Sequence, residues 1–154
     1  QDDGAIVKAA LEGLAAEDVF VVATTAAVDP RSFEVPPNAR VERFGPHGPL
    51  LSRAAAVVCH GGMGITQKAL AAGVPVCVVP FGRDQLEVAR HVEVANAGVR
   101  LEPKRLSPSR LRDAVRAARA CKPGAERMAA AFRQAGGAMR AAGELESLLA
   151  EGVR

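Results

Sequence analysis

The 154-residue sequence contains no tryptophan and no tyrosine, and it has only five phenylalanines. Proteins that bind single-stranded nucleic acid combine base-stacking aromatic side chains with a positively charged groove. Here the net charge of +3 arises from 20 basic and 17 acidic residues, which are interspersed without a basic block. The composition therefore disfavours a nucleic-acid partner and leaves a small anionic ligand open.

Cysteine is also scarce, with three residues far apart in the sequence: Cys59, Cys77 and Cys121. The odd number argues against a disulfide framework, and two of the thiols lie in apolar runs, where cysteine behaves as a small hydrophobic residue. We therefore expect reduced cysteines and a cytoplasmic protein. The longest apolar stretch, residues 70–81, is interrupted by one glycine and two prolines, so we expect no membrane partner.

Short apolar runs alternate with amphipathic segments along the chain. The runs predict strands near residues 19–24, 41–44, 55–59, 76–79 and 99–101. The segments between and after them predict helices near residues 3–16, 50–54, 64–72, 84–97, 108–119 and 125–149. Strands that alternate with helices in this way predict one α/β domain built on a doubly wound, parallel sheet.

Several helix boundaries carry residues that favour a cap or a break. Asp2 or Asp3 is expected to cap the first helix, Asp84 the fourth, and Ser107 the fifth. In the fifth helix a proline at the first helical position strengthens the prediction. A break is expected at Gly136–Gly137, inside the last helical segment.

The most informative segment is CHGGMGIT, residues 59–66, where a buried strand leads through glycines into a helix. Glycines permit close approach of the backbone, and a helix N-terminus offers unpaired N–H groups with partial positive charge. His60 can donate a hydrogen bond to a phosphate oxygen. The pattern suits a diphosphate, although a tight turn with nothing bound remains the alternative. It does not match G-x-G-x-x-G, which disfavours a dehydrogenase.

A carboxylate and an amide stand side by side after the next strand, at Asp84 and Gln85. Together they accept and donate hydrogen bonds, as the recognition of sugar hydroxyls requires. The alternative is that Asp84 only caps a helix. Because the carboxyl ends of parallel strands meet at one edge of the sheet, we expect this pair to lie near His60.

The segment RFGPHGPLLSRAAAVVCHGGMGITQKALAAGVPVCVVPFGRDQ, residues 43–85, resembles the donor-binding half of the UDP-glycosyltransferase family, in its bacterial antibiotic and macrolide branch. A weaker likeness extends toward both ends of the chain. The resemblance implies the Rossmann-like, C-terminal half of the two-domain GT-B architecture. It also implies a UDP- or TDP-sugar donor, a small hydrophobic acceptor whose hydroxyl receives the sugar with inversion, and no cofactor. The sequence has no Asp-x-Asp motif, which fits a reaction without metal.

The resemblance also assigns roles to individual positions. Phe44 would stack on the nucleotide base, the backbone near His47 would bind the edges of the base, and His60 would contact the diphosphate. Asp84 and Gln85 would hold the donor sugar. The turn and helix start that hold the diphosphate would comprise Gly61, Gly62, Gly64, Ile65 and Thr66.

Lys68 departs from the family pattern. At this position the family often has a glutamate that accepts hydrogen bonds from the ribose hydroxyls, whereas an ammonium group carries donors only. Lys68 is therefore expected to face solvent or to touch a phosphate.

In the family, an N-terminal domain binds the acceptor and supplies the general base, and the C-terminal domain opens with a strand and a Gly-Thr or Gly-Ser turn. The sequence contains neither, so we expect residues 1–154 to be an excised donor-binding domain with no catalytic residue of its own and no activity alone. Two alternatives remain: a non-catalytic nucleotide-binding module and one half of a nucleotide-sugar epimerase.

Overall fold

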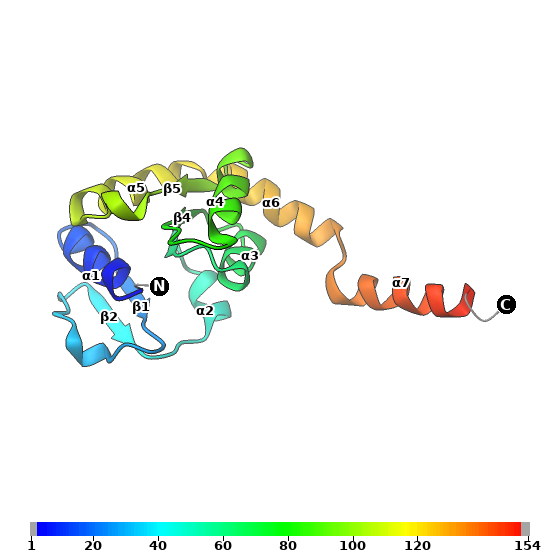
Figure 1. The fold of residues 1–154 in the computed structure, drawn as a ribbon, viewed down its shortest axis with the longest axis horizontal. Coiled ribbons are helices and arrows are strands. Elements are labelled where there is room, and N and C mark those ends of the chain that lie inside the picture. Colours follow the sequence, from blue (N-terminus) through cyan, green and yellow to red (C-terminus); the bar gives the residue numbers. More distant parts are fainter. Residues whose placement is uncertain (1–2, 152–154) are drawn as a thin grey trace.

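The computed structural model describes residues 3–151, which form an α/β fold with parallel strands (Figure 1). The strands are β1 (Val21–Thr24), β2 (Ala39–Glu42), β3 (Val57–Cys59), β4 (Val76–Val78) and β5 (Gly98–Arg100). The helices are α1 (Asp3–Leu14), α2 (His47–Leu51), α3 (Met63–Ala71), α4 (Gln85–Val94), α5 (Pro108–Ala120), α6 (Lys122–Gln134) and α7 (Gly137–Glu151). Two 3₁₀ turns, Pro30–Ser32 and Pro103–Arg105, lie in the loops.

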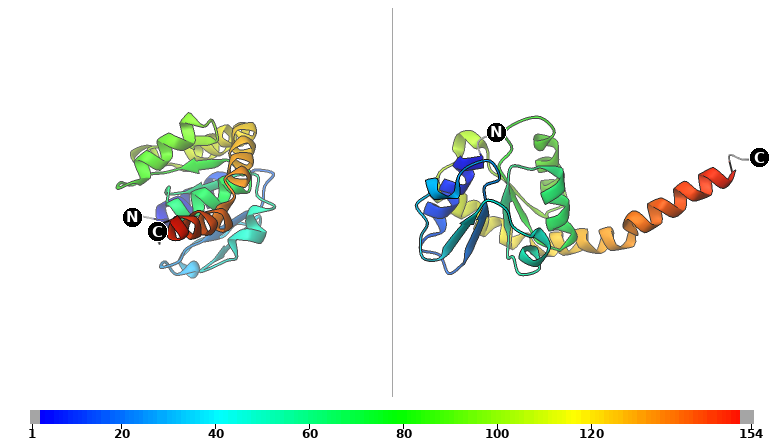
Figure 2. Two further views of the ribbon diagram at one scale, coloured as in Figure 1. Left: turned by 90° about the vertical axis from the view of Figure 1, so that its right-hand side faces the viewer. Right: turned by 90° about the horizontal axis from the view of Figure 1, so that it is seen from below.

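The strands form two parallel sheets in place of the single predicted sheet. β1 pairs with β2, and β3, β4 and β5 form the second sheet in that order. The pair lies alongside the larger sheet (Figure 2), but no strand within residues 3–151 joins β1 to β3. The parallel α/β class is thus as predicted, and the sheet is divided because the described chain has no strand for the position between them.

Helices cover both faces of the larger sheet, as a doubly wound fold requires. On one face, Val76 and Val78 of β4 pack in a cluster with residues of α2, α3, α4 and α6. On the other face, Cys77 and Val79 pack with residues of α1 and α5. Side chains alternate between the faces of a strand, so β4 contributes to both cores.

The predicted break near residue 136 is confirmed. Gly136 and Gly137 both have positive φ, 76° and 57°, and they lie where α6 ends at Gln134 and α7 begins at Gly137. Beyond this break α7 points away from the rest of the chain (Figure 1). It carries exposed apolar side chains at Met139, Leu145, Leu148 and Leu149. Within residues 3–151, no helix combines the length and the apolar character needed to cross a membrane.

The structure confirms the cap of α5 and shortens α1. The Ser107 hydroxyl accepts a hydrogen bond from the backbone N–H of Arg110, which confirms the cap of α5. Asp2 lies outside the described residues, and α1 begins at Asp3. α1 ends at Leu14, two residues before the predicted end at Ala16.

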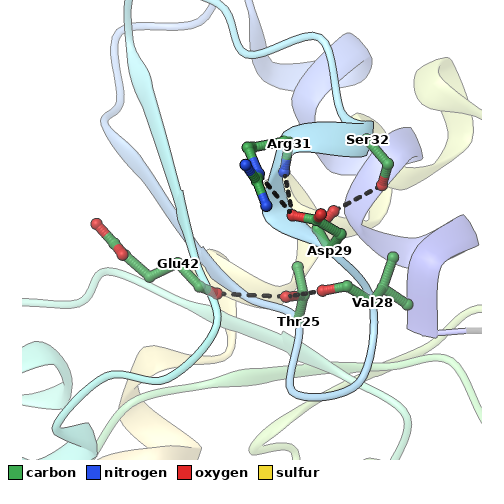
Figure 3. A network of polar contacts seen from close by, with 6 residues as sticks. All are labelled: Thr25, Val28, Asp29, Arg31, Ser32 and Glu42. Atoms are coloured by element: carbon green, nitrogen blue, oxygen red, sulfur yellow. Dashed lines mark hydrogen bonds and ion pairs between the residues drawn. The ribbon is translucent and has the colours of Figure 1, made fainter.

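Thr25 anchors the loop that follows β1 (Figure 3). Its buried hydroxyl donates to the carbonyl oxygen of Val28 at 2.6 Å. Farther along the loop, the carboxylate of Asp29 accepts a hydrogen bond from the backbone N–H of Arg31 at 3.0 Å and caps the first 3₁₀ turn. This backbone bond, together with the Arg31 side chain, holds the pKa of Asp29 below its ordinary value. The loop is therefore fixed by its own short polar contacts.

The turn between β3 and α3 sits directly against β4. Gly61 has φ of 92°, and a Cβ added there would lie 2.8 Å from Cγ1 of Val78. Glycine is thus required at this position both by the backbone conformation and by the close approach to β4. Gly64, one residue into α3, has open space at the same position.

Replacement of Gly61 by alanine should destabilise the protein by about 2 kcal/mol, because it combines a positive φ with a clash against β4. Gly64→Ala is the matched control, and it should be neutral or stabilise α3 by up to about 1 kcal/mol. Urea unfolding of both variants measures the difference. Equal stability of the two variants would show that the turn does not rest on β4 as described.

Cys77 should make the fold sensitive to alkaline pH. Burial raises the pKa of its thiol from 9.0 to about 12, and the neighbouring Cys59 adds to this shift. Between these values the unfolded chain loses the proton while the folded chain keeps it, so the free energy of unfolding falls as pH rises. The free energy of unfolding of wild type should fall between about pH 7 and pH 10. In Cys77→Ala this fall should be smaller by about 1 kcal/mol.

Urea unfolding at the two pH values tests this expectation, with Cys121→Ser as control because Cys121 is only partly buried. The control should retain the pH dependence of wild type. If the free energy of unfolding of Cys77→Ala falls between the two pH values as much as that of wild type, the raised pKa does not belong to Cys77.

Candidate functional site

Residues that follow β3 and β4 meet at one edge of the larger sheet. His60 comes directly after β3, and residues 79–84 connect β4 to α4. At Gly61 the two loops touch, since a Cβ there would lie 3.3 Å from the backbone oxygen of Gln85. The structure therefore brings together the two segments that the sequence analysis singled out.

The start of α3 is open. Gly62 occupies the N-cap position with extended backbone, and a glycine supplies no capping side chain. The space beside Gly64 is empty as well. A nine-residue helix with an uncovered N-terminus presents N–H groups and partial positive charge to whatever lies in front of it.

The His60 imidazole lies over this turn. Its Nε2 atom is 2.6 Å from the position that a Cβ on Gly62 would occupy, so a larger residue at 62 would displace the ring. The side chain is half-buried, and its outer part reaches solvent. The imidazole thus stands beside the open helix terminus, where the sequence analysis expected it.

Thr66 and Ile65 support the turn from inside. Thr66 is only 2% exposed, and its hydroxyl donates to the carbonyl oxygen of Gly62 at 2.9 Å, with Sγ of Cys59 at 3.7 Å. Ile65 packs against the core on the α3 side of the sheet. In this structure both side chains shape the turn, and its solvent-facing residues are His60, Gly62, Met63 and Gly64.

Asp84 stands at the start of α4, but its predicted role as helix cap is wrong. The residue has αR backbone, and its side chain makes no capping hydrogen bond. A capping side chain needs extended backbone at this position, which Asp84 does not have. The carboxylate is exposed and is not used by the helix, whose first residue, Gln85, approaches the turn at Gly61.

Gln85 stabilises the same loop from its buried side. It is buried, with 6% exposure, and Oε1 accepts a hydrogen bond from the backbone N–H of Phe81 at 2.8 Å. Its carbonyl group is therefore committed to the loop, unlike the carboxylate of Asp84. The two neighbours expected to act as a pair have different surroundings.

Arg83 is a feature of this loop to which the sequence analysis gave no role. It is a non-glycine residue with φ of 57°, and it follows Gly82, whose φ is 150°. Such residues cost about 1 kcal/mol or more and concentrate at ligand sites. In the sequence, only the neighbouring Gly82 indicates a turn here, and it does not reveal that the following arginine is the strained residue.

A groove lies on the other side of α3, between α3 and α2. It has a volume of about 540 Å³ and is lined by Gly45, His47, Gly48, Leu51, Lys68, Ala71 and Ala72. Two residues with predicted roles, His47 and Lys68, thus share one cavity. The predicted strand at 41–44 included Phe44, but β2 ends at Glu42, so Phe44 lies two residues beyond it and is 75% exposed.

Within residues 3–151, no group of three or more His, Cys, Asp or Glu side chains is placed to hold a metal ion. The polar groups at the site are the imidazole of His60, the carboxylate of Asp84, the open terminus of α3, and the two groove residues. This set is suited to bind an anion next to a polyol.

Comparison with known proteins places the chain in a family. Residues 8–143 match the model of the erythromycin biosynthesis protein CIII-like, C-terminal domain. Over 109 residues the chain is 50% identical to 4′-demethylrebeccamycin synthase of Lentzea aerocolonigenes, a match that covers 70% of this chain and 25% of the relative. It is 36% identical over 136 residues to NDP-glycosyltransferase YjiC of Bacillus licheniformis, covering 86% and 34%.

Solved structures agree with this placement. The calicheamicin glycosyltransferase CalG4 superposes with a TM-score of 0.89 at 29% identity, over 97% of this chain and 39% of that one. The glycosyltransferase of kitacinnamycin gives 0.83 at 33% identity, over 92% and 38%. The chain thus spans well under half the length of these proteins. It belongs to the erythromycin biosynthesis protein CIII-like C-terminal domain family, and its fold is the Rossmann-like C-terminal half of the GT-B glycosyltransferases.

Proposed function

We propose that the chain is the donor-binding domain of an enzyme that transfers a sugar from a UDP- or TDP-sugar to a hydroxyl of a small hydrophobic acceptor, with inversion. The observation that carries the proposal is the placement of His60 and the open terminus of α3 against the loop that bears Asp84. An anion-binding terminus beside an exposed carboxylate fits the diphosphate and the sugar of one ligand.

The diphosphate is the leaving group of this reaction. Negative charge grows on it as the bond to the sugar breaks, so His60 and the N–H groups of α3 would stabilise the transition state. Asp84 would accept hydrogen bonds from the sugar hydroxyls and orient the ring. The general base that activates the acceptor would come from a second domain, and the reaction would need no metal.

The relatives support the reaction class by what they are named. They include a 4′-demethylrebeccamycin synthase, the glycosyltransferase of kitacinnamycin and a calicheamicin glycosyltransferase. The glycosyltransferase VinC, 34% identical with a TM-score of 0.72, was solved in complex with DTDP. A nucleoside diphosphate is therefore a reasonable first ligand to test with this chain.

His60→Ala should weaken UDP binding about tenfold, since it removes a hydrogen bond to a charged group. Calorimetry of the 154-residue chain with UDP and TDP measures the loss. Uridine, which lacks the diphosphate, should bind wild type and variant equally. His91→Ala, an exposed histidine on α4, is the matched control and should bind as wild type does. Absence of nucleotide binding by wild type would remove the proposal.

Asp84→Asn should lower the affinity for UDP-glucose about fivefold while leaving UDP unaffected, because the carboxylate is proposed to meet only the sugar. Glu87→Gln is the control, an exposed carboxylate in the first turn of the same helix. Calorimetry with both ligands gives the ratio of affinities. A loss of the same size for UDP would place Asp84 at the diphosphate and not at the sugar.

A further inference from the structure

The loop between β4 and α4 carries a charged side chain on a strained turn. Arg83 has φ of 57°, and the next residue, Asp84, has φ of −67°. The backbone N–H of Gln85 donates to the carbonyl oxygen of Gly82 at 3.3 Å and closes the turn around Arg83. A positive φ at the first central position of a turn favours glycine, because a residue with a Cβ is strained there. The sequence has an arginine at this position.

The side chain of Arg83 does not offset this strain within the fold. It is exposed, and among residues 3–151 its guanidinium group forms no hydrogen bond or ion pair. The loop is fixed by another residue, since Oε1 of Gln85 accepts a hydrogen bond from the N–H of Phe81 at 2.8 Å. The loop therefore imposes the strained conformation, and the guanidinium group is available to a ligand.

Arg83 is also the only lysine or arginine in residues 60–64 and 79–84, the two segments that meet at this edge of the sheet. The terminus of α3 supplies about half an elementary charge, and an imidazole adds a full charge only when it is protonated. An arginine side chain is always protonated in proteins. Within these two segments, Arg83 is therefore the group that supplies a permanent positive charge.

The position of Arg83 places it within reach of an anion at the start of α3. Gln85 approaches the His60 turn, since a Cβ on Gly61 would lie 3.3 Å from the backbone oxygen of Gln85. Arg83 precedes Gln85 by two residues, which is about 7 Å of extended chain at most. The long side chain of an arginine can span a separation of this order.

We propose that Arg83 binds the diphosphate of the donor, and that the strained turn is retained because it presents the guanidinium group to the phosphate oxygens. A guanidinium group can pair with two phosphate oxygens at once. When the bond from the sugar carbon to the diphosphate oxygen breaks, its electron pair stays on the diphosphate, and Arg83 would stabilise this added charge. The inference rests on the proposed donor-binding function and adds a residue to it.

Three variants of Arg83 separate its charge from its strain. Arg83→Gly removes both, Arg83→Gln removes only the charge, and Arg83→Lys keeps both. Calorimetry of the 154-residue chain should show UDP binding about tenfold weaker in the glycine and glutamine variants, the loss of a hydrogen bond to a charged group. The lysine variant should remain within about threefold of wild type, because it keeps the charge but not the paired geometry.

Urea unfolding supplies the second readout. Arg83→Gly should have a higher midpoint than wild type, because glycine is unstrained at positive φ, whereas the glutamine and lysine variants should keep the midpoint of wild type. If Arg83 acts on the ligand, affinity for UDP follows the charge at this position and stability follows the strain. An arginine that only shaped the loop would change affinity and stability together.

Two controls and one further ligand accompany these variants. Arg90→Gln removes an exposed positive charge from α4 and should bind UDP as wild type does. Uridine, which has no phosphate, should bind wild type and the Arg83 variants equally. UDP-glucuronate tests whether the guanidinium group binds a carboxylate on the sugar; its affinity should fall in Arg83→Gly by the same factor as that of UDP.

The outcomes separate the role of Arg83 from the donor site as a whole. If Arg83→Gly binds UDP as wild type does, loses affinity only for UDP-glucuronate, or if Arg83→Lys loses as much affinity as Arg83→Gln, the role of Arg83 is overturned. The donor site stands in these cases as long as His60→Ala weakens UDP binding. Failure of wild type to bind UDP overturns the donor site itself, and the role of Arg83 with it.

Discussion

The packing of β4 between two layers of helices is the constraint on which the rest of the structure depends. Val76 and Val78 pack into one core, Cys77 and Val79 into the other, and all four are fully buried. Each buried valine stabilises the fold by about 1.5–3 kcal/mol. β4 also pairs with both neighbouring strands, so it fixes the sheet as well as the cores.

The geometry of the proposed site depends on the same strand. The His60 turn rests on Val78 through Gly61, and the loop that bears Asp84 begins where β4 ends. Gln85 then ties this loop down by its bond to the N–H of Phe81. With the framework held by buried groups, His60 and Asp84 are positioned by residues that do not themselves need to touch a ligand.

The sequence predicted the parallel α/β class and the order of elements, because continuous apolar runs and helical periodicity are local signals. The boundaries of the elements were predicted less accurately. β2 begins at Ala39 and ends at Glu42, so that Phe44 lies outside the strand. α2 begins at His47, three residues before the predicted turn of helix, and includes a proline that the first turn of a helix tolerates.

The details of the site depended on contacts that a linear pattern does not contain. The role of Gln85 follows from the position of the N–H of Phe81, and that of Thr66 from the carbonyl of Gly62. Asp84 has the residue type of a cap, but the strained turn at Arg83 gives it a backbone conformation in which capping fails. The division of the sheet likewise appears only when the strands are paired in space.

The division of the sheet has a consequence for cooperativity. Because β1 and β2 share no backbone hydrogen bonds with β3, the pair is attached to the larger sheet through side chains, chiefly where α1 packs on α5. Val21 of β1 and the buried face of α1 pack in the same apolar cluster as Cys77 and Val79, so separation of the pair would expose part of that core. The stability of β1 and β2 is therefore coupled to that of β3–β5 by side-chain packing in place of a shared ladder of hydrogen bonds.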